Sequence, residues 1–284
     1  MSEWFCETLH SGYGQRLVID KVLFRERTEH QDLIIFENRA FGRVMALDGI
    51  VQTTEGDEFV YHEMLTHVPI LAHGRAKRVL IIGGGDGGMA REALRHTSVE
   101  QVTMVELDRS VVDMCIEHLP SLSNGAFDDP RLDLQFADGA KFVEETDGRW
   151  DVIIVDSTDP IGPGEVLFRE SFYKACKRCL TDGGILVTQN GVPFVQGGEV
   201  TNSFNRLSPH FADVWFYTAA VPTYQGGLMA FGWASDDKSL RQLPVPEIAN
   251  RFDDADIACR YYTPEAHAGA FGLPQFIRKL LISG

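Results

Sequence analysis

The residues best suited to chemistry are carboxylates that come directly after apolar, strand-like segments. Asp86 lies inside the glycine-rich segment 83–88, and Asp156 and Asp159 follow the apolar run 152–155. Glycine turns of this kind usually bring backbone N–H groups and a helix N-terminus to a phosphate, which Asp86 would repel. The loop would attract a cation instead. It therefore predicts a ligand that combines a nucleoside with a positively charged tail.

Two more acids end strands of the same predicted sheet. Glu106 comes about twenty residues after the glycines, where a carboxylate can accept hydrogen bonds from both hydroxyls of a ribose. Asp138 follows the strand 132–137 and can accept a hydrogen bond from an exocyclic amine such as that of adenine. Ligands of open parallel sheets bind beyond the carboxyl ends of the strands. We therefore expect these acids to share one cleft, where a cation would offset their repulsion.

Structural roles and metal binding are the alternatives for these residues. Asp156 and Asp159 could be turn-forming caps, and Glu106 a solvated acid at a strand end. Oxygen ligands could hold magnesium, but the loop lacks the Lys-Ser/Thr pair of a nucleotide-phosphate site, so amine cations fit better. Cys176 and Cys179 have CxxC spacing but fall within the helical pattern 172–180, and no second pair completes a zinc site. The sequence predicts no metal.

Composition narrows the class of protein. Apolar residues make up 44% and charged residues 24% of the 284, as in globular proteins. The 41 acidic and 26 basic residues leave a formal net charge of −15, which disfavours nucleic acid as a partner. The five scattered cysteines indicate a reducing compartment. The N-terminus lacks the pattern of a signal peptide, and no apolar run approaches the ~20 residues of a membrane span, so we expect a cytoplasmic protein.

The order of predicted elements indicates an α/β chain of two domains. Short β-rich runs fill the chain to about Thr54, with a strong hairpin signal at Asp48-Gly49. Helical spacing over 57–73 follows, with Pro69 marking a kink or an end. From Lys77 strands and helices alternate, which predicts a mostly parallel sheet, and two late strands, 211–218 and 228–233, predict an antiparallel hairpin at its edge. We place an N-terminal β-stranded domain at 1–56 and the catalytic domain at 57–284.

Several segments, in this order along the chain, resemble the spermidine synthases of the polyamine aminopropyltransferase family. The resemblance spans nearly the whole chain, and the ordered set is far more specific than any one member. The segments are Gln31-Asp-Leu, 47–55, 57–64, 83–88, Glu106, Asp138-Gly139, 156–160, Gly162-Pro163 and Pro222-Thr-Tyr224.

The resemblance implies a fold, substrates and site residues. The fold is a Rossmann-like, methyltransferase-type sheet, and the substrates are decarboxylated S-adenosylmethionine, as a co-substrate with no separate cofactor, and putrescine. The products are spermidine and methylthioadenosine. The family pattern implies a homodimer or homotetramer. By that pattern Glu106 holds the ribose, Asp138 and Gly139 the adenine, Gln31 and Pro163 complete the nucleoside pocket, Asp86 holds the aminopropyl ammonium, and Tyr61, His62, Asp159 and Tyr224 line the diamine channel.

This implied chemistry explains the acid in the loop. The decarboxylated donor keeps an ammonium and a sulfonium but lacks the carboxylate that Asp86 would repel, so the charge change selects against ordinary S-adenosylmethionine. The acceptor amine must lose a proton, and Asp156 is the candidate base, assisted by the hydroxyls of Tyr61 and Tyr224.

Alternatives to these roles stay open. His62 could instead bond its own helix, and Tyr224 could be a packing residue. The rival functions are methylation of a diamine and a non-catalytic polyamine-binding module. Cadaverine, agmatine and spermidine are alternative acceptors to putrescine.

Overall fold

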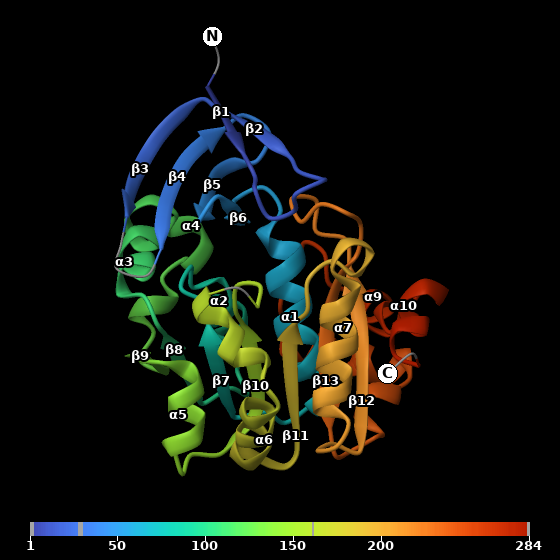
Figure 1. Ribbon diagram of the computed structural model, residues 1–284. Coiled ribbons are helices and arrows are strands. Elements are labelled where there is room, and N and C mark those ends of the chain that lie inside the picture. The colour runs from blue at the N-terminus through green and yellow to red at the C-terminus, as the bar shows by residue number, and fades with distance from the viewer. Residues whose placement is uncertain (1–2, 28–30, 161, 283–284) are drawn as a thin grey trace.

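The N-terminal part of the chain consists of strands. The computed structural model describes residues 3–27, 31–160 and 162–282, without the side chains of 162 and 163. One two-stranded and one four-stranded antiparallel sheet lie at one end of the molecule (Figure 1). Their strands are β1 (Glu3–Cys6) and β2 (Arg16–Ile19) in the first, and β3 (Lys21–Arg27), β4 (Asp32–Asn38), β5 (Gly42–Leu47) and β6 (Ile50–Thr54) in the second.

The predicted hairpin joins β5 to β6. Asp48 and Gly49 both have positive φ, 49° and 78°, and Leu47 pairs with Ile50 across the turn. Positive φ at both central residues is the geometry that matches the twist of the paired strands. The sequence prediction of a turn here is therefore confirmed.

Alternate residues of β4 enter two different cores, because side chains along a strand point to opposite faces. Ile34 and Phe36 pack with the two-stranded sheet. Leu33 and Ile35 pack against Val111 and its neighbours on the helices that follow. The strand thus fastens the N-terminal sheet onto the rest of the molecule.

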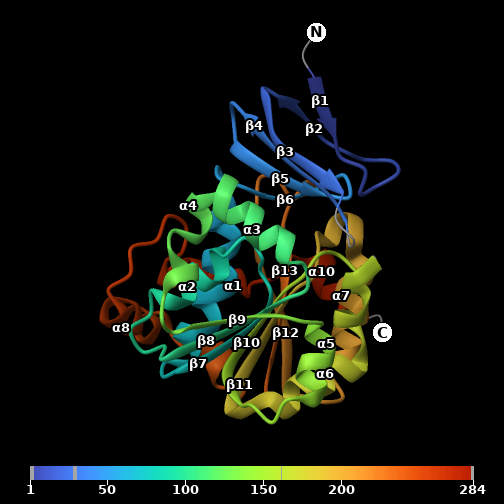
Figure 2. The ribbon, with the colours of Figure 1, turned by 90° about the vertical axis from the view of Figure 1, so that its left-hand side faces the viewer.

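A seven-stranded sheet forms the larger part of the molecule, with helices on both faces (Figures 1 and 2). Its order is β12-β13-β11-β10-β7-β8-β9, in which the five strands from β11 to β9 run parallel and β13 and β12 are antiparallel. The predicted Rossmann-like α/β class and the antiparallel edge are confirmed. The strands are β7 (Arg78–Gly83), β8 (Gln101–Glu106), β9 (Leu132–Phe136), β10 (Trp150–Asp156), β11 (Leu180–Gln189), β12 (Asp213–Ala219) and β13 (Met229–Ser235).

The sheet order reverses between β7 and β10, which are neighbours although β8 and β9 separate them in the chain. A crevice opens at such a switch point beyond the carboxyl ends of the strands. The helices and helical turns that surround the sheet are α1 (Glu58–His73), α2 (Gly88–Leu94), α3 (Arg109–His118), α4 (Pro120–Ser123), η1 (Ala126–Asp128), α5 (Gly139–Glu145), η2 (Gly162–Phe168), α6 (Glu170–Cys179), α7 (Pro193–Leu207), η3 (Leu240–Gln242), α8 (Val245–Ala255), α9 (Pro264–Ala270) and α10 (Gln275–Leu280).

Helix α1 is buried along nearly its whole length and carries residues toward the crevice from its first turns. Pro69 lies inside the helix and does not end it. The end comes at Gly74, whose φ of 75° lets its N–H bond the carbonyl of Ile70, a left-handed cap that favours glycine.

The C-terminal helices are tied to α1 by one buried carboxylate. Glu63 accepts backbone N–H bonds of 2.7–2.8 Å from Arg260, Tyr261 and Tyr262. Charge-assisted bonds of this kind are about twice as strong as neutral ones. These bonds fasten the C-terminal segment to α1 at residues 260–262.

The cysteine pair lies on a helix. Cys176 and Cys179 are both buried in α6, where burial raises the pKa of each thiol. All five cysteines lie in the described residues and are free. Within 3–27, 31–160 and 162–282 no helix combines the length and the apolar character that crossing a bilayer requires.

Candidate active site

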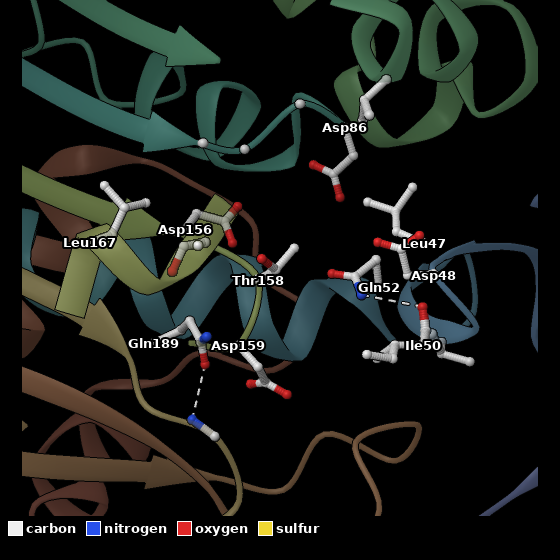
Figure 3. Close-up of a pocket in the computed structure, with 18 of the residues that line it drawn as sticks. Leu47, Asp48, Ile50, Gln52, Asp86, Asp156, Thr158, Asp159, Leu167 and Gln189 are labelled. Atoms are coloured by element: carbon white, nitrogen blue, oxygen red, sulfur yellow. Dashed lines mark hydrogen bonds between the residues drawn. The ribbon is translucent and has the colours of Figure 1, made fainter. Parts of the chain in front are cut away.

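A cavity of about 450 Å³ opens at the switch point of the sheet, between the strand ends and the N-terminal strands. Figure 3 shows the carboxylates of Asp86, Asp156 and Asp159 on the walls of this one space. Glu106 and Asp138 also line it. The five acids that the sequence placed in one cleft are therefore brought together.

The glycine loop holds Asp86 by close backbone packing. A Cβ on Gly83 would lie 1.9 Å from the carbonyl oxygen of Asp156 in the neighbouring strand, and Gly83 has a φ of 86°. Glycine is required here because no side chain fits either restriction. The N–H of Gly84 then bonds the same carbonyl at 3.2 Å, so the loop and the end of β10 are joined backbone to backbone.

Asp86 is buried and holds two contacts at the base of the loop. Its Oδ1 accepts the N–H of Gly88 at 2.8 Å, and its Oδ2 lies 3.3 Å from Nε2 of His62 on α1. Burial opposes the ionised form, but the His62 charge and the Gly88 N–H outweigh it and lower the pKa of Asp86. The loop acid is therefore ionised. The His62 ring thus lies next to Asp86. Its role in the diamine channel stays a prediction.

Asp156 ends β10 opposite the loop and is bonded by a tyrosine. The hydroxyl of Tyr61 donates to Asp156 Oδ1 at 2.6 Å. Burial and the charge of Asp86 raise the pKa of Asp156 to about 6, against the effects of His62 and the Tyr61 hydroxyl. Tyr224 meets the Tyr61 ring edge to face at 5.6 Å, and its hydroxyl bonds the carbonyl of Gln52. A carboxylate of this pKa is ionised above pH 6 and is a stronger base than an ordinary one.

The other end of the cavity is formed by β8, β9 and the loop before β4. Glu106 accepts the N–H of Asp108 at 2.9 Å, and burial raises the pKa of Glu106 to about 7. Asp138 caps α5 through Oδ1, which accepts the N–H groups of Ala140 and Lys141. Gln31 donates to Asp108 at 3.2 Å and lines the cavity near Glu106, as Gly139 does. Asp138 therefore caps α5 and lines the cavity at the same time.

Asp159 lines another side of the cavity, close to the side-chain amides of Gln189 and Gln196. Burial raises the pKa of Asp159, while hydrogen bonds from Gln196 and Gln189 act in the opposite direction. Gln189 ends β11 and accepts the N–H of Gly191 at 2.9 Å (Figure 3). Pro163, which the family pattern assigns to the nucleoside pocket, has a side chain outside the described residues.

The N-terminal strands close the cavity with residues that the sequence patterns did not single out. Glu7 accepts the N–H of Val51 at 3.0 Å and also bonds the side chains of Gln15 and Gln225. Gln52, His10 and Glu7 line the cavity. No local pattern marks them, because their position depends on how the small sheet sits over the large one.

A buried aspartate links the start of α1 to the loop that carries Tyr224. Asp57 Oδ2 accepts the N–H and the hydroxyl of Thr223 at 2.8 and 2.7 Å, and its Oδ1 accepts the Thr54 hydroxyl at 2.6 Å. Asp57 is thus the meeting point of the N-terminal sheet, α1 and the loop after β12. In the described residues, no three or more His, Cys, Asp and Glu side chains form a group that could hold a metal ion.

Comparison with known proteins gives a consistent result. Residues 58–243 match the model of the spermine/spermidine synthase domain, and residues 3–55 match that of the spermidine synthase tetramerisation domain. The chain belongs to the spermine/spermidine synthase family. It is 64% identical over 271 residues to polyamine aminopropyltransferase 1 of Pseudomonas aeruginosa, covering 95% of each chain. It is 60% identical over 274 residues to the polyamine aminopropyltransferase of Serratia proteamaculans, covering 96% of this chain and 95% of the other.

Solved structures of spermidine synthases match the whole fold. One, in complex with the transition-state analogue AdoDATO, has a TM-score of 0.93 and 38% identity, covering 99% of this chain and 96% of the other. The enzyme from Thermotoga maritima has a TM-score of 0.89 and 36% identity, covering 98% and 94%. As a member of this family, the chain is an enzyme of aminopropyl transfer in polyamine biosynthesis.

Proposed function

We propose that this enzyme transfers the aminopropyl group of decarboxylated S-adenosylmethionine to putrescine and forms spermidine and methylthioadenosine. The observation that carries the proposal is that two acids whose pKa values are shifted in opposite directions line the same cavity. Asp86 has a lowered pKa and stays ionised, whereas Asp156 has a pKa raised to about 6 and is hydrogen-bonded by Tyr61. A carboxylate that stays ionised can pair with the ammonium of the donor, and a carboxylate with a raised pKa accepts a proton more readily.

The donor would lie along the β7–β8–β9 side of the cavity. Asp86 would pair with the aminopropyl ammonium, and Glu106 would accept the ribose hydroxyls. Asp138 and the backbone of Gly139 would contact the adenine, with Gln31 and Pro163 completing the pocket. The charges support this placement, because a donor that still carried its carboxylate would bring it against Asp86.

The acceptor would enter on the β10–β11 side. One amine would face Asp156, between Tyr61 and Tyr224, and the other end would reach Asp159. His62, whose ring lies 3.3 Å from Asp86, would line the diamine channel where it meets the donor site. A primary amine with a pKa of about 10 must first lose a proton, which Asp156 accepts.

The transfer itself is a displacement at carbon. The amine nitrogen forms a bond to the terminal carbon of the aminopropyl group as the bond from that carbon to sulfur breaks. The bonding electron pair goes to sulfur, which turns the sulfonium into a neutral thioether. The positive charge passes from sulfur to the nitrogen, which keeps two protons and leaves as a secondary ammonium. Because the sulfonium is already a good leaving group, positioning supplies much of the rate.

We extend the proposal to cofactors and assembly. The reaction needs no cofactor, since decarboxylated S-adenosylmethionine is consumed. The match of residues 3–55 to a tetramerisation domain supports a homo-oligomer, a dimer or a tetramer. A cytoplasmic location stays a prediction that rests on the scattered cysteines, and the net charge of −15 disfavours nucleic acid.

The deciding experiment follows methylthioadenosine release with decarboxylated S-adenosylmethionine and putrescine. Release that depends on both substrates is expected, and its absence with folded protein would reject the proposal. Methyl transfer from ordinary S-adenosylmethionine is the rival reaction, and tighter calorimetric binding of that carboxylated donor would favour it. Cadaverine, agmatine and spermidine, tested in parallel, rank the acceptor. Polyamine binding without turnover would indicate a non-catalytic module.

A further inference from the structure

A series of buried charges extends from Asp86 away from the cavity. His62 lies between two carboxylates, with Nε2 3.3 Å from Asp86 Oδ2 and Nδ1 2.5 Å from Glu58 Oε2. All three side chains are at most 9% exposed. Glu58 is bonded in turn by Arg91 Nη2 at 2.8 Å. The order of charges is therefore acid, imidazole, acid, guanidinium.

The two carboxylates determine the protonation of the ring. A carboxylate is an acceptor, and imidazole donates from both nitrogens only as the cation. Burial lowers the pKa of His62, but the charges of Asp86 and Glu58 outweigh it and hold the pKa well above the usual value. The charged groups that surround the ring are Glu58 on its own helix, Asp86 on the loop, Arg91 on α2 and Asp156 on β10.

The ring is also packed against the loop itself. A Cβ on Gly88 would lie 2.3–2.7 Å from three atoms of the His62 ring. Gly88 is the residue whose N–H bonds Asp86 Oδ1, so ring and loop backbone hold the same carboxylate from two sides. The glycine at this position thus has a packing role apart from the conformation of the turn.

Glu58 is fixed from a second helix. Arg91 on α2 bonds Glu58 through Nη2, Glu92 through Nε at 2.7 Å, and the carbonyl of Leu122 through Nη1 at 2.6 Å. Three bonds to three different groups fix the position of the guanidinium. Arg91 therefore holds Glu58 in place, Glu58 holds the His62 ring, and the ring holds Asp86.

The charges of the four groups cancel. With His62 protonated, Asp86 and Glu58 contribute −2, and His62 and Arg91 contribute +2. Arg91 keeps Glu92 as a second partner, so the loss of Glu58 leaves one carboxylate fewer beside the imidazolium. One negative charge fewer at this place makes the site less favourable for an incoming ammonium.

We propose that Glu58 is a positioning residue for the donor: through His62 it aims the ionised Asp86 at the aminopropyl ammonium and balances the imidazolium charge. The proposal rests on the function proposed above and adds a residue outside the cavity to its donor site. It also explains why a carboxylate meant for a cation lies beside a cation of the protein.

Replacement of Glu58 by Gln separates this role from a structural one. In E58Q the ring keeps one carboxylate partner, so the pKa of His62 falls toward its usual value. Below that pKa the uncompensated cation opposes the donor, and above it the neutral ring does not. We expect decarboxylated S-adenosylmethionine to bind about tenfold more weakly to E58Q at low pH and to approach parental affinity at high pH.

The experiment is calorimetry of three ligands at several pH values. Decarboxylated S-adenosylmethionine carries an ammonium and a sulfonium, the dimethylsulfonium derivative of 5′-deoxyadenosine carries a sulfonium alone, and methylthioadenosine carries neither charge. E58Q should weaken the first most and leave the third unchanged. Glu63→Gln is the matched control, because Glu63 is also buried on the same helix but bonds the C-terminal segment. It should lower stability and leave all three affinities unchanged.

Two results would overturn the proposal. Equal weakening of all three ligands would show that Glu58 acts only on the shape of the pocket. Parental affinities for all three at every pH would show that the site does not need Glu58. If the parent protein itself fails to prefer the ammonium-bearing ligand to methylthioadenosine, the proposed function falls together with this inference, so the two failures are distinguishable.

Discussion

The hydroxyl of Tyr61 lies 2.6 Å from Oδ1 of Asp156, although 95 residues separate them in the chain. Burial raises the pKa of the Tyr61 phenol well above its usual value, with the charge of Asp156 adding to the effect. The phenol therefore stays a donor at every working pH, and the bond favours the ionised carboxylate. Asp156, the proposed base, and the Tyr61 hydroxyl therefore form one hydrogen-bonded unit.

Asp156→Asn removes the proton acceptor while keeping the shape of the side chain. We expect turnover to fall by about 10³, within the range for the loss of a general base. Donor affinity should change little, because the proposed contacts to the nucleoside come from the ends of β8 and β9 and not from β10. Methylthioadenosine release and donor calorimetry check the two expectations. Turnover close to parental would remove Asp156 from the mechanism.

The pH dependence of turnover should show one limb from Asp156. Its ionised form accepts the proton, so turnover at saturating substrates should fall as pH decreases through about 6. Tyr61→Phe deletes the bond that lowers the pKa of Asp156, which therefore rises, and the limb should move to higher pH. Profiles of both proteins between pH 5 and 9 test this, where each pH unit of movement equals about 1.4 kcal/mol. An unmoved limb would contradict the assignment.

Asp86→Asn should reduce the discrimination between donors. Loss of a buried charge facing a cation costs 2 kcal/mol or more, so decarboxylated S-adenosylmethionine should bind about 30-fold more weakly. Ordinary S-adenosylmethionine loses a repulsion as well as an attraction and should be affected less. The ratio of the two dissociation constants, measured by calorimetry, is the readout. An unchanged ratio would show that selectivity lies elsewhere.

Asp57→Asn should loosen the loop that carries Tyr224. Asp57 bonds Thr54 and Thr223, and a neutral amide cannot accept all three of these bonds. We expect a loss of about 2–4 kcal/mol in the free energy of unfolding and a higher acceptor KM, with donor KM less affected. Denaturant unfolding and steady-state kinetics measure these quantities. The exposed Asp254→Asn is the control, and equal effects in it would contradict the role given to Asp57.

Much of the site could be predicted because strand ends are visible in the sequence. Apolar runs followed by acids placed Asp86, Glu106, Asp138 and Asp156 at one edge of a parallel sheet, and all four line the cavity. The order of elements likewise predicted the α/β class, and the hairpin at Asp48-Gly49 was confirmed. These features depend on local chemistry, which a single sequence contains.

The remaining features depend on contacts between distant segments. Asp57 and Thr223 are 166 residues apart, and nothing near either one indicates the other. Glu58 and His62 have the spacing of neighbours on a helix, but the approach of Gly88 to the ring requires the packing of α1 on α2. Pro69 was expected to mark a kink or an end, and helix α1 continues past it to His73, where the N–H of Gly74 caps the carbonyl of Ile70.

The main-chain bond between the glycine loop and the end of β10 has a consequence for how this enzyme can vary. Gly83 pairs with Asp156 in register, and the Gly84 N–H bonds the Asp156 carbonyl. The separation of the loop acid from the base is thus set by peptide groups, which substitution of side chains does not alter. Substitutions in the N-terminal strands and in the Tyr224 loop can therefore change other sides of the cavity while the separation of Asp86 and Asp156 stays the same.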